Sequence, residues 1–191
     1  MTRARRLGAV LAGGQSSRFG SDKALAMLDG ESLIARAVDS LAMWCDAVVV
    51  VGREQGPAPC IPDWPRPGMG PLGGIAAALR HAEAEGFAEV LTIGVDCPDL
   101  PDDLPARLGA APAMIASQPV IGLWPAGAAA DVAAILQGSG KHSLRALAER
   151  IGARGVMLPS DPANINTPSD LADLRRRDSS GGAGEGETQP H

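Results

Sequence analysis

Two neighbouring glycines near the start of the chain are followed by a polar loop that carries two cations. Gly13 and Gly14 end a short apolar run, and Arg18, Gly20 and Lys23 come after them. Glycine lets a backbone N–H approach a ligand closely because it has no Cβ, and consecutive amides in such a loop form a cup for an anion. With its two cations, the segment predicts a binding site for the phosphates of a nucleoside triphosphate. A polar connection between a strand and a helix is the alternative interpretation.

The loop differs from two well-known phosphate-binding motifs. Lys23 stands three residues after Gly20, whereas a P-loop NTPase has its lysine directly after a glycine. The loop also lacks the G-x-G-x-x-G pattern of dinucleotide-binding folds. The sequence therefore predicts a phosphate site of another kind.

A single carboxylate follows a second apolar run. Asp96 comes after residues 90–93 and precedes Cys97 and Pro98. In open α/β sheets, ligands bind at the carboxyl ends of the strands, so Asp96 and the glycine loop are expected at one edge. Because Mg²⁺ takes one or two carboxylates plus phosphate oxygens, Asp96 predicts a magnesium site. The alternative is an Asp turn before Pro98. Cys97 is interpreted as a packed thiol, since no positioned base is evident.

Asp63 precedes a segment rich in glycine and proline. Gly68, Gly70, Gly73 and Gly74 would permit close approach of a flat base or a sugar. The Asp63 carboxylate could then accept hydrogen bonds from the N–H groups of a base. An exposed aspartate in front of a Gly/Pro loop is the alternative.

Two asparagines lie near the end of the chain. Asn164 and Asn166 flank Ile165, and alternate residues of an extended segment face the same way. The pair could thus present two amides to one ligand. Turn chemistry ahead of the last helix is the alternative.

Short apolar runs alternate with segments rich in alanine and leucine. Strands are expected over 7–12, 47–51, 90–93, 114–116, 120–124 and 155–158, and helices over 33–43, 75–84, 129–137, 143–151 and 170–176. This alternation predicts parallel strands joined by right-handed crossovers, and strands without polar alternation predict helices on both faces. We expect an α/β fold with three layers, α/β/α and Rossmann-like, around a mostly parallel sheet with a mixed edge.

Three local features complete the expected organisation. Ser32 and Ser169 are predicted helix caps. Residues 53–72 are predicted to be a long loop without regular structure, which is often functional. A single domain over 1–177 and a disordered tail over 178–191 are expected, because the tail has too few apolar residues to bury.

Composition excludes several classes of partner. A net charge of −5 without a basic stripe argues against nucleic acid, and no apolar run is long enough to span a membrane. The 3 cysteines form no C-x-x-C pair, and their odd number argues against a disulfide framework. These observations predict a cytoplasmic protein.

Together, these segments resemble the molybdenum cofactor guanylyltransferases, within a group of nucleotidyltransferases related to sugar-nucleotide pyrophosphorylases. The resemblance is carried by Leu-Ala-Gly-Gly at 11–14 with Arg18, Gly20, Asp22 and Lys23, by Gly-Pro-Leu-Gly-Gly at 70–74, by Asp96 with Pro98, and by Asn-Ile-Asn-Thr-Pro at 164–168. These matches follow the family's order from residue 7 to residue 170.

The chain departs from the family pattern at a few positions. The loop after Gly14 is one residue shorter than in some members, and Gly73 stands where alanine is usual. Gly52 and Arg53 follow the second strand, where an asparagine is often found. Gly13 favours guanine, whereas cytidylyl relatives tend to carry alanine there.

The resemblance implies a nucleotidyltransferase fold and a role for each matched residue. The residues that would contact GTP are Leu11, Ala12, Gly13, Gly14, Lys23, Asp63 and Asp96. Asp96 would hold Mg²⁺, and Arg18 and Lys23 would assist catalysis by stabilising the departing pyrophosphate. Asn164 and Asn166 would lie toward molybdopterin.

The implied reaction is the Mg-dependent transfer of GMP from GTP to molybdopterin, which forms molybdopterin guanine dinucleotide and pyrophosphate. Two enzyme alternatives stay open: a molybdopterin cytidylyltransferase, and a transferase acting on a sugar or polyol phosphate. A nucleotide-binding module without catalysis is a third, and the presence of Asp96 argues against it. Maturation proteins of molybdoenzymes are the further partners that this function would involve.

Overall fold

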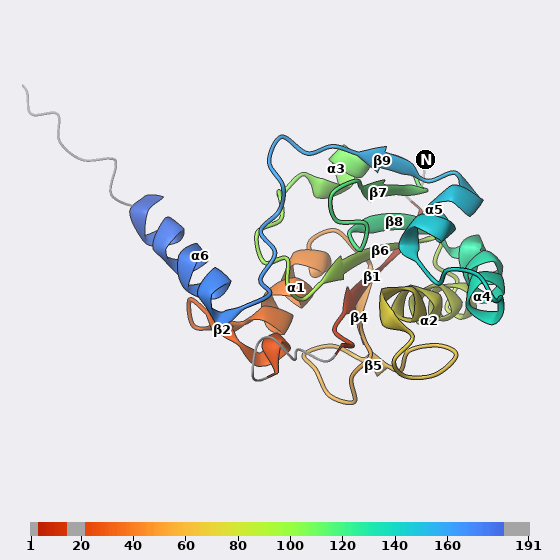
Figure 1. Cartoon of the computed structure of the whole chain (residues 1–191), viewed down its shortest axis with the longest axis horizontal. Helices are drawn as coiled ribbons and strands as arrows, with labels where there is room; N and C mark the ends of the chain where they lie inside the picture. Colours follow the sequence, from red (N-terminus) through yellow and green to blue (C-terminus); the bar gives the residue numbers. More distant parts are fainter. Residues whose placement is uncertain (1–3, 15–21, 182–191) are drawn as a thin grey trace, which may run out of the picture.

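A seven-stranded sheet forms the middle layer of the computed structural model, which describes residues 4–14 and 22–181 (Figure 1). The strands are β1 (Arg6–Leu11), β4 (Ala47–Val51), β5 (Cys60–Ile61), β6 (Glu89–Gly94), β7 (Ala113–Ile115), β8 (Gly122–Pro125) and β9 (Arg154–Val156). Their order is β5-β4-β1-β6-β8-β7-β9. The first four are parallel, whereas β8 runs antiparallel to both β6 and β7. The predicted mostly parallel sheet with a mixed edge is confirmed.

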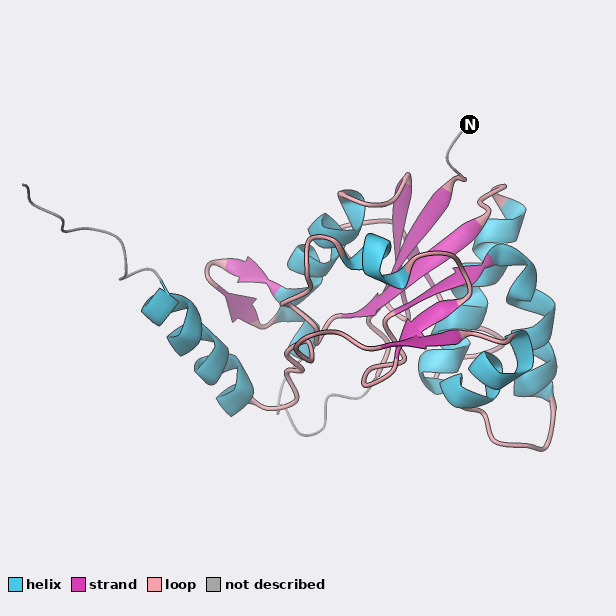
Figure 2. Ribbon diagram, turned by 90° about the horizontal axis from the view of Figure 1, so that it is seen from above, coloured by secondary structure: helices cyan, strands magenta, loops and turns pink. Residues whose placement is uncertain are grey.

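Helices cover both faces of this sheet (Figure 2). On one face lie α1 (Leu33–Ala42) and α3 (Leu104–Leu108), and on the other α2 (Gly70–Ala84), α4 (Ala129–Gln137) and α5 (Leu144–Ile151). Neighbouring strand residues enter opposite cores: Val90 packs with α2, and Leu91 packs with α1. Since both faces are covered, the strands carry apolar residues without alternation. The three-layer α/β/α expectation is confirmed.

Several predicted elements match the structure closely. The strand over 47–51 and the helix over 129–137 have the expected bounds. Helix α1 begins after Ser32, whose Oγ accepts a hydrogen bond from the Ala35 N–H at 3.3 Å. This is the predicted cap, and it satisfies one of the free N–H groups of the first turn.

Helix α2 begins earlier than expected, at Gly70 instead of residue 75. Pro71 in the first turn favours this start. Gly73 and Gly74 therefore lie inside the helix, and the structure gives the reason. A Cβ at Gly73 would lie 2.5 Å from the Cβ of Met69, and one at Gly74 would lie 3.1 Å from Leu11 Cδ2. The glycines let the helix approach β1 and its own preceding loop.

The prediction that residues 53–72 lack regular structure is wrong in part, because β5 (Cys60–Ile61) lies within them and α2 includes 70–72. Strand β5 has two residues and pairs with Val50 and Val51 of β4. Its pairing depends on a neighbouring strand, so local composition could not reveal it.

Helix α6 (Pro168–Gly181) extends away from the sheet (Figure 1). It begins before Ser169, and Thr167 replaces Ser169 as the capping residue, since Thr167 Oγ1 accepts a hydrogen bond from the Asp170 N–H at 3.2 Å. The helix passes position 178, where the tail was expected to begin. Residues 182–191 lie outside the described residues, so a disordered tail stays a prediction for them. Within the described part of the chain, no helix has the length and apolar character needed to cross a membrane.

A small annex connects α6 to the rest of the protein. It contains the short turn η1 (Lys23–Leu25) and the hairpin β2–β3 (Met27–Leu28, Glu31–Ser32), whereas the second short turn, η2 (Ala126–Ala128), packs with α2 and α4. Leu171 and Leu174 of α6 pack with Leu28, Leu33 and Ile165. This third apolar cluster anchors residues near the end of the chain beside residues near its beginning.

Candidate active site

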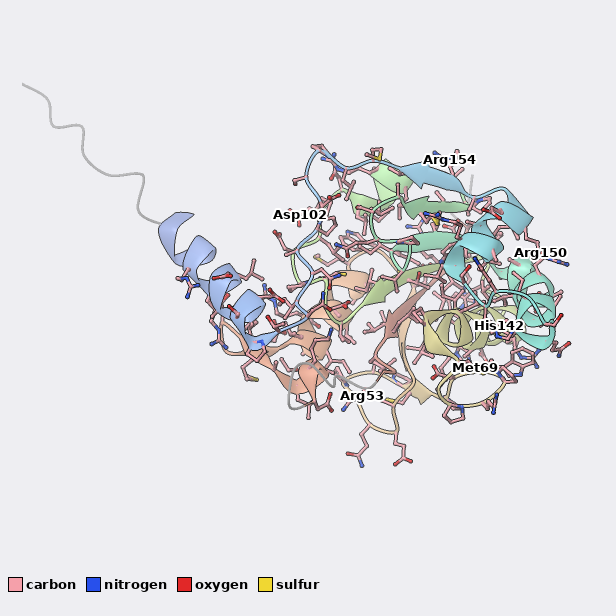
Figure 3. All side chains as sticks on the ribbon, in the orientation of Figure 1. Arg53, Met69, Asp102, His142, Arg150 and Arg154 are labelled. Atoms are coloured by element: carbon pink, nitrogen blue, oxygen red, sulfur yellow. The ribbon has the colours of Figure 1, made fainter. Side chains whose placement is uncertain are left out.

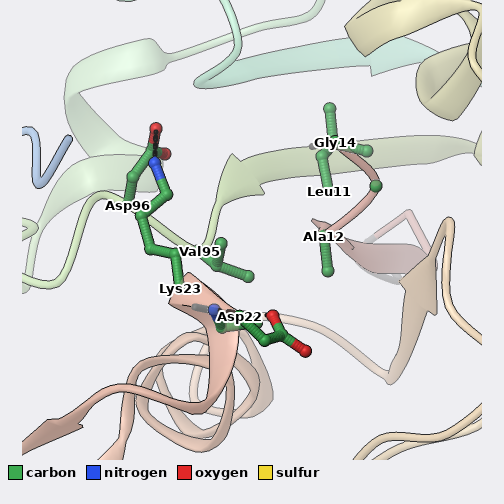
Figure 4. A pocket seen from close by; sticks show the side chains of 9 residues that line it. Leu11, Ala12, Gly14, Asp22, Lys23, Val95 and Asp96 are labelled. Carbon is green, nitrogen blue, oxygen red and sulfur yellow. Dashed lines mark hydrogen bonds and ion pairs between the residues drawn. The ribbon is translucent and has the colours of Figure 1, made fainter. Parts of the chain in front are cut away.

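A pocket opens where the carboxyl ends of β1 and β6 meet the η1 turn (Figure 4). It is lined by Leu11, Ala12, Gly13, Gly14, Asp22, Lys23, Ala24, Val95 and Asp96. Six of the predicted site residues are thus brought together: Leu11, Ala12, Gly13, Gly14, Lys23 and Asp96. Arg18 lies outside the described residues.

Lys23 connects the two sides of this pocket. Its Nζ lies 3.3 Å from Asp96 Oδ2 and donates a hydrogen bond to the carbonyl oxygen of Ile165 at 3.0 Å. The Ile165 N–H in turn donates to the carbonyl oxygen of Asp96 at 2.9 Å. Lys23, Asp96 and Ile165 therefore form one connected group, although they lie far apart in the sequence.

Asp63 lies directly behind the glycine pair. A Cβ placed on Gly13 would lie 3.2 Å from Asp63 Oδ2 and 3.2 Å from the Cα of Gly52. Burial raises the pKa of the Asp63 carboxyl, and a backbone hydrogen bond from Gly68 opposes this shift in part. The ends of β1 and β4 and the Asp63 loop thus meet in a contact that leaves no room for a side chain at Gly52 and little room for one at Gly13.

The two asparagines lie beside this group without facing the pocket floor. Asn164 and Asn166 are exposed on either side of Ile165, which is buried at 1% exposure. Asn164 lines a neighbouring hollow together with residues of α6. The Asn166 N–H donates to Asp170 Oδ2 at 2.9 Å, so the turn chemistry considered as an alternative is also present. Through Ile165, both asparagines adjoin Lys23 and Asp96.

Cys97 is buried and joins a hydrogen-bonded chain. Its Sγ lies 2.9 Å from Gln118 Oε1, and Gln118 Nε2 donates to the carbonyl oxygen of Pro162 at 2.6 Å. Burial, helped by the charge of Asp96, raises the pKa of the Cys97 thiol well above its usual range. The thiol therefore stays protonated, which agrees with the interpretation of Cys97 as a packed residue.

Sequence reasoning missed two residues that hold this site together. Gln118 links the loop after β6 to Pro162, and Arg53 pairs with Asp22 at 2.5 Å. Arg53 follows β4, and Asp22 precedes Lys23. A charged residue two positions after the end of a strand was the available signal for Arg53, whereas no sequence pattern pointed to Gln118.

The donor groups in the pocket fit a metal that is held jointly with a substrate. Across residues 4–14 and 22–181, no group of three or more His, Cys, Asp or Glu side chains is arranged around a common point. The Asp96 carboxylate retains 26% exposure in the pocket. Since Mg²⁺ is commonly held by one or two carboxylates and completed by phosphate oxygens, this donor set suits a cation that arrives with a phosphorylated ligand.

The chain is a nucleotidyltransferase, as its fold, this pocket, its family and its relatives together show. The same fold occurs in a nucleotidyl transferase from Methanothermobacter thermautotroptrophicus, with a TM-score of 0.67, 20% identity and coverage of 93% of this chain and 99% of that one. More particularly, the chain belongs to the MobA-like NTP transferase family, whose domain matches residues 8–159.

Two relatives connect this family to molybdenum cofactor biosynthesis. The molybdenum cofactor guanylyltransferase of Rhizobium leguminosarum bv. trifolii is 40% identical over 190 residues, which cover 88% of this chain and 91% of the relative. The crystal structure of molybdopterin-guanine dinucleotide biosynthesis protein A from Archaeoglobus fulgidus has a TM-score of 0.71 and 25% identity, covering 91% of this chain and 99% of that one. The resemblance inferred from the four motifs is confirmed.

Proposed function

We propose that this chain transfers GMP from GTP to molybdopterin, forming molybdopterin guanine dinucleotide and releasing pyrophosphate. The observation that carries the proposal is the meeting of Gly13, Gly14, Lys23 and Asp96 in one pocket. Backbone amides and a cation suit phosphate, and a carboxylate beside them suits a divalent metal. The 40% identity to a molybdenum cofactor guanylyltransferase supports this choice of substrates.

The nucleotide would bind at the carboxyl ends of β1 and β4. Leu11 and Ala12 would contact the nucleoside, and the amides of Gly13 and Gly14 would face its phosphates. The Asp63 carboxylate behind Gly13 would accept hydrogen bonds from the N–H groups of guanine. A side chain at Gly13 would press against Asp63, so the glycine preserves the space this recognition requires.

The reaction would be a direct displacement at phosphorus. A terminal phosphate oxygen of molybdopterin forms a bond to the α-phosphorus of GTP, and the bond from that phosphorus to the pyrophosphate oxygen breaks. The attacking phosphate is already ionised at neutral pH, so no general base is required. Catalysis then rests on positioning and charge stabilisation.

Asp96 would hold Mg²⁺, which when bound neutralises phosphate charge between the two substrates. Lys23 Nζ, which lies 3.3 Å from Asp96 Oδ2, would move to a phosphate oxygen and stabilise the departing pyrophosphate. We assign Arg18 the same task. Asn164 and Asn166, which adjoin this group through Ile165, would orient molybdopterin.

The protein would act in the cytoplasm. The three cysteines, all in the described part of the chain, form no disulfide, which agrees with a reducing cytoplasm. Transfer of the finished dinucleotide to molybdoenzymes would involve their maturation proteins.

The direct test is pyrophosphate release from each of the four common nucleoside triphosphates, with and without molybdopterin and with and without Mg²⁺. We expect release from GTP when both molybdopterin and Mg²⁺ are present, and little release otherwise. Faster release from CTP would indicate a cytidylyltransferase. Release with a sugar phosphate as the acceptor, and none with molybdopterin, would contradict the proposal.

A further inference from the structure

A second carboxylate lies in the pocket that would receive a triphosphate. Asp22 lines this pocket next to Lys23, and its side chain is 41% exposed. Among the described lining residues the only cation is Lys23, which already pairs with Asp96. Left unpaired, Asp22 would repel a polyanionic ligand, because like charges at short range are unfavourable in a partly dehydrated pocket.

Arg53 supplies the countercharge from outside the pocket lining. Its Nη1 lies 2.9 Å from Asp22 Oδ1, and its Nη2 lies 2.5 Å from Asp22 Oδ2. This two-point contact is the strong geometry of a guanidinium with a carboxylate. The hydrogen bond from Arg53 also lowers the pKa of Asp22, so the carboxylate is ionised at neutral pH.

The two partners come from different parts of the fold. Arg53 follows Gly52 where β4 ends, in the lower part of the view in Figure 3. Asp22 caps the η1 turn, since its Oδ1 also accepts a hydrogen bond from the Ala24 N–H at 3.2 Å. Asp22 and Lys23 leave this turn in different directions, with Lys23 directed at Asp96 (Figure 4).

We propose that Arg53 is a positioning residue for the triphosphate, acting by cancelling the charge of Asp22 rather than by touching phosphate itself. This inference rests on the proposed function, because it takes the pocket to be the triphosphate site. Both Nη atoms of the guanidinium contact Asp22, and Nε donates to the carbonyl oxygen of Gln55 at 3.4 Å, so the charges of Arg53 and Asp22 cancel at the pocket wall. Among the described residues of the pocket, Lys23 and the glycine amides then determine the local potential.

The test uses two single variants and their combination in the full chain. Arg53→Met removes the charge and keeps an unbranched side chain. Asp22→Asn removes the opposing charge and keeps the oxygen that caps η1. Arg150→Met is the matched control, because Arg150 pairs with Asp131 at 2.7 Å on the helices α4 and α5, away from the pocket.

Affinity for Mg·GTP and for Mg·pyrophosphate is measured by calorimetry at low and at high salt. Arg53→Met should weaken both affinities about tenfold at low salt, and less at high salt, because the exposed Asp22 charge is then screened. Asp22→Asn leaves the Arg53 charge uncompensated and should bind at least as tightly as wild type. The double variant should recover most of the affinity that Arg53→Met loses.

Each other outcome overturns the inference. A double variant as weak as Arg53→Met would show that Arg53 contacts the ligand directly. An Asp22→Asn variant as weak as Arg53→Met would show that the pair acts as a structural clamp. An equal loss in Arg150→Met would show a general charge effect.

The two ligands separate this inference from the proposed function. A wild-type chain that binds pyrophosphate but not GTP would overturn the proposed function, and the same variants measured with pyrophosphate would still decide the role of Arg53. A wild-type chain that binds neither ligand would overturn both.

Discussion

The two sides of the site are built in different ways. On the nucleotide side, which comprises Gly13, Gly14, Gly52 and Asp63, main chain from two strand ends meets main chain: a Cβ on Gly52 would lie 2.6 Å from the Cα of Gly13. On the acceptor side, which comprises 96–97, Gln118 and 162–166, side chains hold the segments together.

This difference predicts different responses to substitution. Main-chain atoms cannot relieve a clash by changing a side-chain rotamer. An added methyl group between two packed strand ends must therefore displace one of them. The side-chain contacts of the acceptor side can each be removed singly, and each should have a graded effect. A single substitution on the nucleotide side should therefore abolish ligand binding, whereas a single substitution on the acceptor side should only weaken it.

Asp96, which lies on the acceptor side and is the proposed metal ligand, is the exception to the graded response and should give the largest effect. Asp96→Asn is expected to reduce Mg-dependent turnover by about 10²–10³-fold, because it removes the charge that would hold the metal. Pyrophosphate release measures this, and circular dichroism should show an intact fold. Asp99→Asn, at an exposed carboxylate three residues away, is the control and should retain activity. Activity like that of wild type in Asp96→Asn would remove Asp96 from the mechanism.

The abrupt response of the nucleotide side is tested at Gly52, which has φ +85°. Gly52→Ala should lower the free energy of unfolding and abolish tight GTP binding, since it adds both backbone strain and a clash. Gly30 has the same φ of +85° with nothing within 4 Å of an added Cβ. Gly30→Ala should thus cost only the strain, about 1–2 kcal/mol, and Gly52→Ala about 1–3 kcal/mol more. If urea unfolding showed that both variants lose the same free energy of unfolding, the close packing of Gly52 against Gly13 would be contradicted.

Asp63 gives the nucleotide side a dependence on pH. Only the ionised carboxylate accepts hydrogen bonds at both oxygens, so GTP affinity should fall as the pH falls through the raised pKa of Asp63. Asp63→Asn should weaken GTP binding about tenfold near neutral pH and flatten this profile. Calorimetric titrations across the acid range, again with Asp99→Asn as control, measure both effects.

The same pKa shift has the opposite consequence for stability. As the pH rises above 3.8, the ordinary value, the unfolded chain releases the Asp63 proton before the folded chain does. The free energy of unfolding therefore falls as the pH rises through this window. Asp63→Asn removes this contribution, so its stability should decline less than that of wild type over the same window. A profile unchanged by the substitution would contradict the assignment to Asp63.

The graded response of the acceptor side is tested at Gln118. Gln118→Ala should raise KM for molybdopterin about fivefold, because the hydrogen bonds to Pro162 and Cys97 are lost and the segment after Pro162 is held less firmly. KM for GTP should not change. Gln137→Ala, at the exposed end of α4, is the matched control. Equal changes in both KM values would show that Gln118 supports the fold generally rather than the acceptor side.

The sequence predicted those parts of the fold that depend on local patterns. The strand over 47–51 and the helix over 129–137 have unbroken apolar or alanine-rich stretches, and Ser32 marks its helix by a local cap. In contrast, the two residues of β5 become a strand only because β4 lies beside them. Helix α2 begins at Gly70 because its glycines fit against β1, which composition does not reveal.

The site residues also fall into two groups, those that the sequence predicted and those that only the folded structure reveals. Glycines, a lysine and an aspartate at strand ends could be placed at one edge because parallel strands share their direction. Gln118 contacts Cys97 and Pro162, which lie 21 and 44 residues away in the chain. Arg53 and Asp22 are separated by 31 residues. Such contacts form only in the folded structure, and the spacing of residues in the sequence does not predict them.

The bond between Ile165 and Asp96 also bears on when the protein becomes active. The Ile165 N–H and carbonyl oxygen hold Asp96 and Lys23, so residues from the last part of the chain complete a pocket begun by the first strand. A nascent polypeptide that still has residue 165 inside the ribosome lacks this contact. The pocket of such a polypeptide is therefore incomplete until residue 165 has left the ribosome and reached Asp96 and Lys23.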